Sequence, residues 1–197
     1  MSRGSKIKRV FRTYGFRWPI VLVAALLSIS AWASRQPDAR EQRELNRAIA
    51  TIALTAESVE VSKHLSEMMA HHLILIEDAW DSSLYGQTSY PITGDQTVTI
   101  NARAIPDVGA ALYRTHNGPY DLFEDRIWLA SVLVHEWLHT TQSWVFVHSD
   151  RAGVEPPAWL EQKRFLKRVR SSVPDDSMRI QRVDMLIDRV AAEIASD

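Results

Sequence analysis

Cysteine is absent from the 197-residue sequence, and its absence excludes several kinds of chemistry. The chain forms no disulfide bond, offers no thiolate to a zinc ion, and has no thiol nucleophile and no cysteine for lipid attachment. Any metal ion must therefore be bound by histidine, aspartate or glutamate side chains.

Basic residues are in the minority among the charged residues outside the N-terminus. Residues 1–17 hold six of the 23 lysines and arginines and no acidic residue, which leaves 17 basic residues against 24 acidic ones in the remainder. A protein that binds nucleic acid needs a basic face, whereas the body of this chain is acidic. The composition therefore argues against nucleic acid as a partner.

Long apolar runs are rare in this sequence. Only residues 18–34 lack charge over a length comparable to a membrane segment. Basic residues before such a segment stay in the cytoplasm, so residues 1–17 form a cytoplasmic n-region and residues 35–197 are expected outside. The segment is either a transmembrane anchor or a signal peptide cleaved after Ala33, and its tryptophans at both ends favour the anchor. We expect contact with the membrane through this segment and a periplasmic or extracellular domain, which would be secreted if cleavage occurs.

Residues 35–197 are predicted to form one mainly helical α+β domain. Amphipathic spacing indicates helices within residues 37–83 and again near the C-terminus, while β-branched residues at 97–101 indicate a strand that pairs with residues 89–93 across a turn at Gly94. The expected elements after this hairpin are a helix from about 127 to 144, a loop over 148–157, a helix that begins at Pro156-Pro157, and a last helix over 176–195.

The most informative stretch is His135-Glu136-Trp137-Leu138-His139. Side chains four residues apart lie one above the other on a helix, so His135 and His139 would direct two imidazoles to one metal ion. Glu136 lies about 100° round the helix from His135, where a carboxylate serves as a general base without ligating the metal. Thr140, Thr141 and Gln142 are candidates to support the histidine rings, although hydroxyls near a helix end often bond to the backbone.

Two histidines require at least one further protein ligand, and the downstream candidates are His148, Asp150, Glu155 and Glu161. Here residues 127–166 resemble the gluzincin-like group of zincin metallopeptidases through His135-Glu136-Trp137-Leu138-His139 and Glu155-Pro156-Pro157-Ala158. The resemblance implies a zincin-like fold, a Zn²⁺ cofactor, and Glu155 as third ligand, because that group commonly has a small residue three positions after the ligand.

Glu161 is the alternative third ligand, because Trp159-Leu160-Glu161 is similar to the tryptophan-preceded ligand of other gluzincins. Its spacing is one residue short, however, and Arg164 replaces the small residue. Pro156 and Pro157 are expected to put Glu155 at the very start of a helix, where an acidic residue is also favoured by the helix dipole. Both glutamates therefore stay candidates on sequence grounds.

The expected function is that of a zinc metallopeptidase that hydrolyses a peptide or protein substrate, with Glu136 as general base. The alternatives are a catalytically silent, zinc-stabilised envelope protein that binds or assembles partners, and an anchored helical interaction module without metal. Two further groups of residues are weaker candidates for function: Tyr113, His116 and Tyr120 as oxyanion donors, and His64, His71 and His72 with Glu77, Asp78 and Asp81 as a second metal site.

Overall fold

The computed structural model describes residues 34–55, 58–78, 85–91, 94–106, 123–142, 151–173 and 177–196. They form a mixed α+β domain in which helices predominate, as the sequence predicts. The predicted n-region and all but Ser34 of the predicted membrane segment lie outside these residues. None of the helices within the described ranges is both long and apolar enough to cross a membrane.

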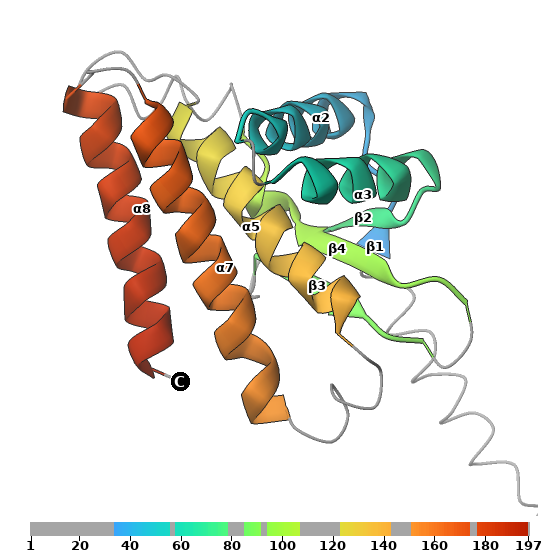
Figure 1. Cartoon of the computed structure of the whole chain (residues 1–197). Coiled ribbons are helices and arrows are strands. Elements are labelled where there is room, and N and C mark those ends of the chain that lie inside the picture. The colour runs from blue at the N-terminus through green and yellow to red at the C-terminus, as the bar shows by residue number, and fades with distance from the viewer. Residues whose placement is uncertain are drawn as a thin grey trace, which may run out of the picture. The chain divides into compact units, whose positions relative to one another are not determined.

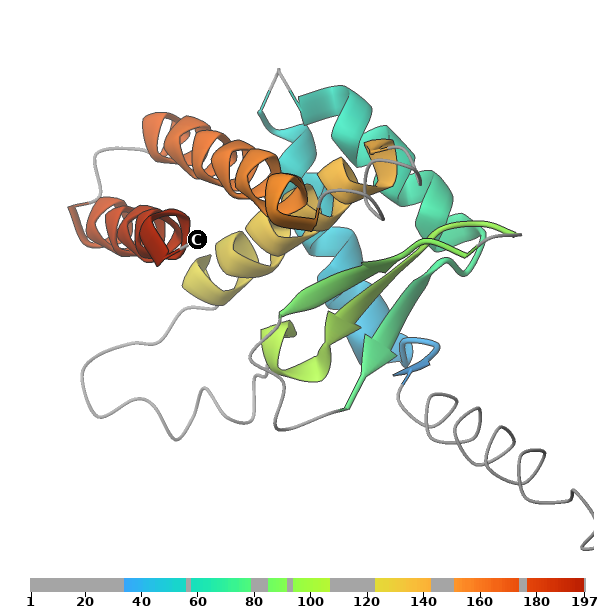
Figure 2. The same cartoon turned by 90° about the horizontal axis from the view of Figure 1, so that it is seen from below.

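A four-stranded sheet forms one side of the domain, with the helices packed on one of its faces (Figures 1 and 2). Its order is β1-β2-β4-β3, in which β2 and β4 are parallel and the two outer pairs are antiparallel. Alternate residues of the central strands are buried, among them Ile76 and Ile100, so the sheet presents an apolar face to the core. The strands are β1 (Ser34–Arg35), β2 (Ile74–Glu77), β3 (Gly86–Ser89) and β4 (Thr97–Asn101).

The central helix of the domain is α5 (Phe123–Thr141), which carries the two histidines of the sequence motif. Residues 127–136 are buried on every side of this helix, because it packs against α2 (Ala39–Ala53), α3 (Val59–Ala70), α7 (Arg151–Ser172), α8 (Ser177–Ser196) and β3. A helix that is apolar nearly all round must have such neighbours, which is what its sequence predicts. A short 3-10 helix, η2 (Ala102–Ala104), follows β4.

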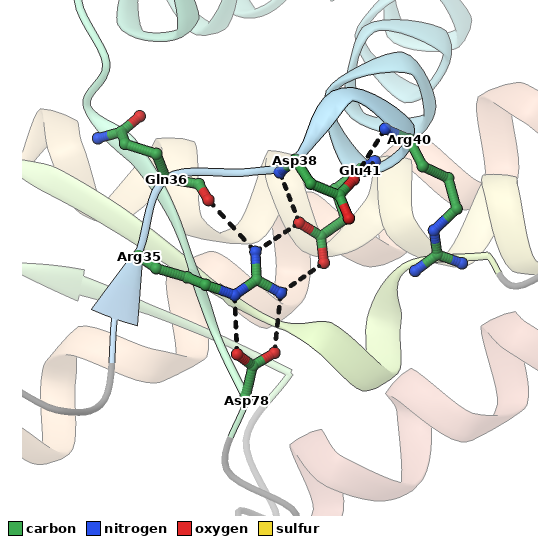
Figure 3. A network of polar contacts seen from close by, with 6 residues as sticks. All are labelled: Arg35, Gln36, Asp38, Arg40, Glu41 and Asp78. Atoms are coloured by element: carbon green, nitrogen blue, oxygen red, sulfur yellow. Dashed lines mark hydrogen bonds and ion pairs between the residues drawn. The ribbon is translucent and has the colours of Figure 1, made fainter.

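Arg35 anchors the first described residues to the domain (Figure 3). Its guanidinium donates to both carboxylate oxygens of Glu41 at 2.6 and 2.8 Å and to those of Asp78 at 2.8 and 2.9 Å. Glu41 also accepts from the backbone N–H of Asp38, whose own side chain caps α2 in a capping box. The cluster therefore joins β1, the start of α2 and the end of β2.

The hydrogen bonds and charge of Arg35 lower the pKa of Glu41 and that of Asp78, in both cases against the opposing effect of desolvation. The bonds from backbone N–H groups lower the pKa of Asp38. All three carboxyl groups are therefore held in the charged form by the folded chain.

Several predicted boundaries are wrong. Residues 37–83 were expected to be helical, yet 74–77 form β2, because a short apolar run suits a buried strand as well as a helix. The first helix of this region, α2, ends at Ala53, and the apolar Leu54 that follows is its C-cap residue and is 82% exposed. The predicted hairpin is confirmed with a shifted partner strand: β3 covers 86–89, and Ser89 faces Thr97.

The predicted start of α7 is also wrong. This helix begins at Arg151, one turn before Glu155, and so contains Pro156 and Pro157 instead of starting at them. Proline has no N–H group, so Pro156 and Pro157 cannot make the i→i−4 hydrogen bonds that residues in the second turn of a helix normally make. The Gln142 side chain donates to the Val154 carbonyl at 3.0 Å and so holds the first turn from outside.

Candidate metal centre

His135 and His139 lie on the same face of α5, as their spacing predicts, and both are buried. Their Nε2 atoms are 3.1 Å apart, and the two rings meet edge to face with centroids separated by 4.8 Å. The ring of Trp159 on α7 also contacts His135, with ring centroids 4.3 Å apart. The two imidazoles are thus directed to a common point and are fixed there by packing.

Glu155 completes the group from α7. Its Oε2 lies 3.2 Å from His135 Nε2 and 3.6 Å from His139 Nε2. The three side chains form a group whose potential ligand atoms all lie within 4.8 Å of one another, so they could hold a metal ion. The early start of α7 contributes to this arrangement, because it puts Glu155 one turn inside the helix, with its carboxylate near the Nε2 atoms of both histidines.

The electrostatics of the group favour a cation at its centre. Hydrogen bonds to His135 and His139 hold the pKa of Glu155 well below its usual range. Burial alone would lower the pKa of His139, but its bonds to Glu155 and Gln142 outweigh burial and raise it. A carboxylate and imidazole nitrogens at these separations form a donor set for positive charge, whether a proton or a metal ion carries it.

Gln142 orients the second histidine. Its Oε1 lies 2.9 Å from His139 Nδ1 while its Nε2 donates to Val154, so one side chain connects the end of α5 to the start of α7. When His139 Nδ1 carries the proton, Nε2 presents its lone pair to the centre of the group. The Thr140 and Thr141 hydroxyls instead donate to carbonyls of their own helix, which is the ordinary role for hydroxyls near a helix end.

Glu136 is held separately from the three potential ligands. Thr88 of β3 donates its hydroxyl to Glu136 Oε2 at 2.8 Å and also lies 3.1 Å from the Glu136 carbonyl oxygen. Gly86 makes room for this side chain, because a Cβ atom built there would lie only 2.7 Å from Glu136 Cγ and Oε1. Burial raises the pKa of Glu136. Strand β3 therefore fixes a carboxylate of raised proton affinity beside the histidine pair.

A cleft of about 690 Å³ opens over this group. Its lining residues come from strand β3 and from helices α5, α7 and α8. Tyr90, just after β3, lines the cleft and donates its hydroxyl to the His139 carbonyl at 2.6 Å. The residues that line it are Tyr85 to Tyr90, Trp128, Val132, His135, Glu136, His139, Val154, Glu155, Trp159, Gln162, Arg189 and Glu193.

The structure separates the two glutamates that the sequence leaves open. Glu161 is bonded to Arg168 at 2.8 Å and lies 3.4 Å from Arg164, away from the histidines. The other proposed positions, His148, Asp150, Tyr113, His116 and Tyr120, lie outside the described residues, as does Asp81. Asp78 belongs to the Arg35 cluster, and no second group with metal-ligand geometry occurs in the ranges the structure describes.

Sequence reasoning did not identify Gly86, Thr88, Tyr90 or Arg189 as part of this site. A strand-forming pattern near residue 90 shows that a hairpin exists, but it does not show which helix the hairpin packs against. Comparisons with protein-family models, with curated proteins and with solved structures found no match for this chain. The site must therefore be interpreted from its own geometry.

Proposed function

We propose that this protein is a zinc-dependent peptidase of zincin type, with His135, His139 and Glu155 as ligands and Glu136 as general base. The observation that carries the proposal is the convergence of three ligand atoms in a cleft, with the separately held carboxylate of Glu136 beside them. His135, His139 and Glu136 are buried while Glu155 is partly exposed, and buried titratable groups are costly unless a function maintains them.

The donor set fits zinc. Nitrogen and oxygen ligands lie about 2.0–2.2 Å from Zn²⁺ in tetrahedral sites, which puts neighbouring ligand atoms about 3.3 Å apart. The three separations in this group are 3.1, 3.2 and 3.6 Å. Two imidazoles and one carboxylate also match the set that catalytic zinc sites use, in which the fourth position is left for water or substrate.

Bound zinc would supply a Lewis acid that polarises the scissile carbonyl and lowers the pKa of water to about 7. Glu136 would take the proton of the attacking water and pass it to the leaving amine, so that hydroxide joins the carbonyl carbon as the C–N bond breaks. Thr88 keeps the carboxylate oriented for this transfer. Gln142 keeps His139 in the tautomer that leaves Nε2 free to ligate.

The edge of the sheet supports a peptide as substrate. Strand β3 is the last strand in the sheet order, and its four residues line the cleft. One side of β3 pairs with β4, and no other described strand pairs with the second side. An extended peptide can bind such an edge through main-chain hydrogen bonds, which would lay the peptide along the histidine pair.

We further propose that the domain works outside the cytoplasm, held to the membrane by residues 18–34. Support comes from the charge of the preceding residues, six of which are basic and none acidic. An external peptidase would process other proteins of the cell envelope or peptides that reach it.

The test is hydrolysis by the zinc-loaded, full-length chain purified in mild detergent. Peptide pools are incubated with the protein, and new termini are identified by mass spectrometry. We expect cleavage by the natural chain, and no cleavage by Glu136→Gln with zinc content unchanged, since Gln cannot accept the proton but leaves the three ligands intact. Glu161→Gln, which changes an equivalent charge on α7 outside the cleft, should cleave normally.

Cleavage that persists in Glu136→Gln would refute the role of this residue. Zinc binding without any cleavage by the natural chain would instead support the alternative of a silent, zinc-stabilised envelope protein.

A further inference from the structure

The cleft also carries an arginine that the proposed hydrolysis does not use. Arg189 of α8 lines the cleft and is solvent-exposed. Its Cζ lies 4.1 Å from the ring centroid of Trp128 and 4.7 Å from that of Tyr85. Those two rings are nearly perpendicular, with an interplanar angle of 89° and centroids 5.2 Å apart. The guanidinium is therefore held in the corner between two aromatic side chains.

This arrangement fixes a side chain that is otherwise flexible. Cation–π contact with both rings and a hydrogen bond from Arg189 Nη2 to the Tyr85 hydroxyl restrict the orientation of the guanidinium. Arginine has five N–H donors, and the Tyr85 oxygen accepts from only one nitrogen. None of the ion pairs among the described residues involves Arg189. A preorganised guanidinium with free donors is suited to bind a planar anion in a bidentate manner.

The position of Arg189 relative to the metal centre follows from α5. Trp128 and His135 are seven residues apart on this helix, which corresponds to about 10 Å along its axis. An extended peptide advances by about 3.3 Å per residue, so a peptide along β3 would have a residue near Arg189 about three positions from the bond at the histidines. Tyr85, which contacts Arg189, directly precedes β3, so the guanidinium lies in line with the edge that would bind the peptide.

We propose that Arg189 forms a specificity subsite for a carboxylate of the substrate, about three residues from the scissile bond. This inference rests on the proposed peptidase function and names the substrate class as acidic peptides. The carboxylate has two possible sources, namely an aspartate or glutamate side chain and the C-terminus of the peptide. Arg189 binds either through the same N–H donors, and its effect is on substrate binding.

Glu193 lines the same cleft and lies one turn further along α8 than Arg189. Its carboxylate lowers the positive potential that an acidic substrate meets there. Replacing Glu193 by Gln should therefore strengthen the preference for a carboxylate, whereas replacing Arg189 should remove it. The two substitutions give opposite results if the subsite is correctly placed.

The test measures binding and cleavage with the zinc-loaded full-length chain. Fluorescein-labelled octapeptide pools contain one Glu at a varied position among neutral residues, and the matched pools contain Gln instead, each with a free or an amidated C-terminus. Anisotropy with the Glu136→Gln variant measures affinity without turnover. We expect about tenfold tighter binding of the Glu pool or of the free-terminus pool, which corresponds to about 1.4 kcal/mol. Which pool shows the preference identifies the source of the carboxylate.

Arg189→Gln, made in the Glu136→Gln background, should abolish this preference. Arg189→Glu should reverse it, so that a further set of pools with Lys in place of the Glu binds more tightly than the Gln pools. Arg182→Gln is the matched control, since it removes a positive charge from the same helix outside the cleft and should change nothing. Equal binding of all pools, or a preference that survives Arg189→Gln, overturns the subsite. If the neutral pools are still cleaved by the natural chain, the peptidase function stands without the subsite. Absence of both binding and cleavage overturns the peptidase together with the subsite.

Discussion

A single methyl group on β3 should disable the proposed general base. In Gly86→Ala the new Cβ would lie 2.7 Å from Glu136 Cγ and Oε1 and 2.9 Å from Cδ, well inside van der Waals contact. Gly86 sits in a regular strand and does not have a positive φ, so alanine itself is compatible with the backbone. The whole effect of the substitution therefore falls on the Glu136 side chain or on the distance between β3 and α5.

Relief of the overlap requires a displacement of about 0.7 Å to reach ordinary contact near 3.4 Å. A shift of this size would break or lengthen the 2.8 Å bond from Thr88 to Glu136. Misplacing a catalytic group by about 1 Å costs up to about 100-fold in rate, so we expect kcat to fall by about 10- to 100-fold. Overpacking should lower the free energy of unfolding by about 1–3 kcal/mol. Zinc content should not change, because Glu136 is not a ligand.

The assay compares kcat, the unfolding midpoint and zinc content for Gly86→Ala and Gly94→Ala. Gly94 has a φ of +101° and no atom near the position of its would-be Cβ, so alanine there strains the backbone without touching the site. We expect Gly94→Ala to lose stability while keeping kcat. Normal kcat in Gly86→Ala, or loss of its zinc, would refute the assignment of Glu136 as a base held by β3.

Two further predictions test the hydrogen bond between Gln142 and His139 and the ion pair between Arg35 and Glu41. Gln142→Leu should weaken zinc binding by about 10- to 100-fold in a competition titration, because His139 loses its orienting partner and the buried ring loses its hydrogen bond; unchanged affinity would contradict that role. Arg35→Gln should destabilise the fold by about 1–3 kcal/mol at pH 7 in urea unfolding, because the nearly fully buried Glu41 side chain loses its charged partner, whereas the exposed Arg43→Gln should have little effect. Because Arg35 lowers the pKa of Glu41, the stability that this pair contributes is complete above the unfolded-state pKa of a glutamate, near 4.3. It disappears as the pH falls through the lower folded-state pKa. The difference in unfolding free energy between the natural chain and Arg35→Gln should therefore shrink in acid.

The parts of the fold that the sequence predicts best are those with a long, regular pattern. The helix that carries His135 and His139 and the C-terminal helix, α8, were both expected, because each repeats apolar residues over several turns. The spacing of the two histidines was sufficient to place them together. The choice of Glu155 depended on a family resemblance, and in the structure Glu155 lies with the histidines while Glu161 pairs with Arg168.

The errors arise where short segments depend on their neighbours. Residues 74–77 form a strand because they pair with β4 on one side and β1 on the other, and a run of four residues carries no period that shows this. The prolines of α7 were expected to start the helix, but an added turn is stabilised from outside by Gln142. The contacts of Thr88 and Gly86 with Glu136 join residues about fifty positions apart, and local pattern alone does not reveal such contacts.

The zinc content of the purified full-length chain tests the central claim most directly. Elemental analysis after zinc loading and removal of excess metal should find about one zinc per chain, lost in His139→Ala, reduced in Glu155→Ala and unchanged in Glu161→Ala, because only the first two contribute ligand atoms to the group. A folded chain that takes up no zinc, or a chain that keeps its zinc in both His139→Ala and Glu155→Ala, would contradict the proposed site.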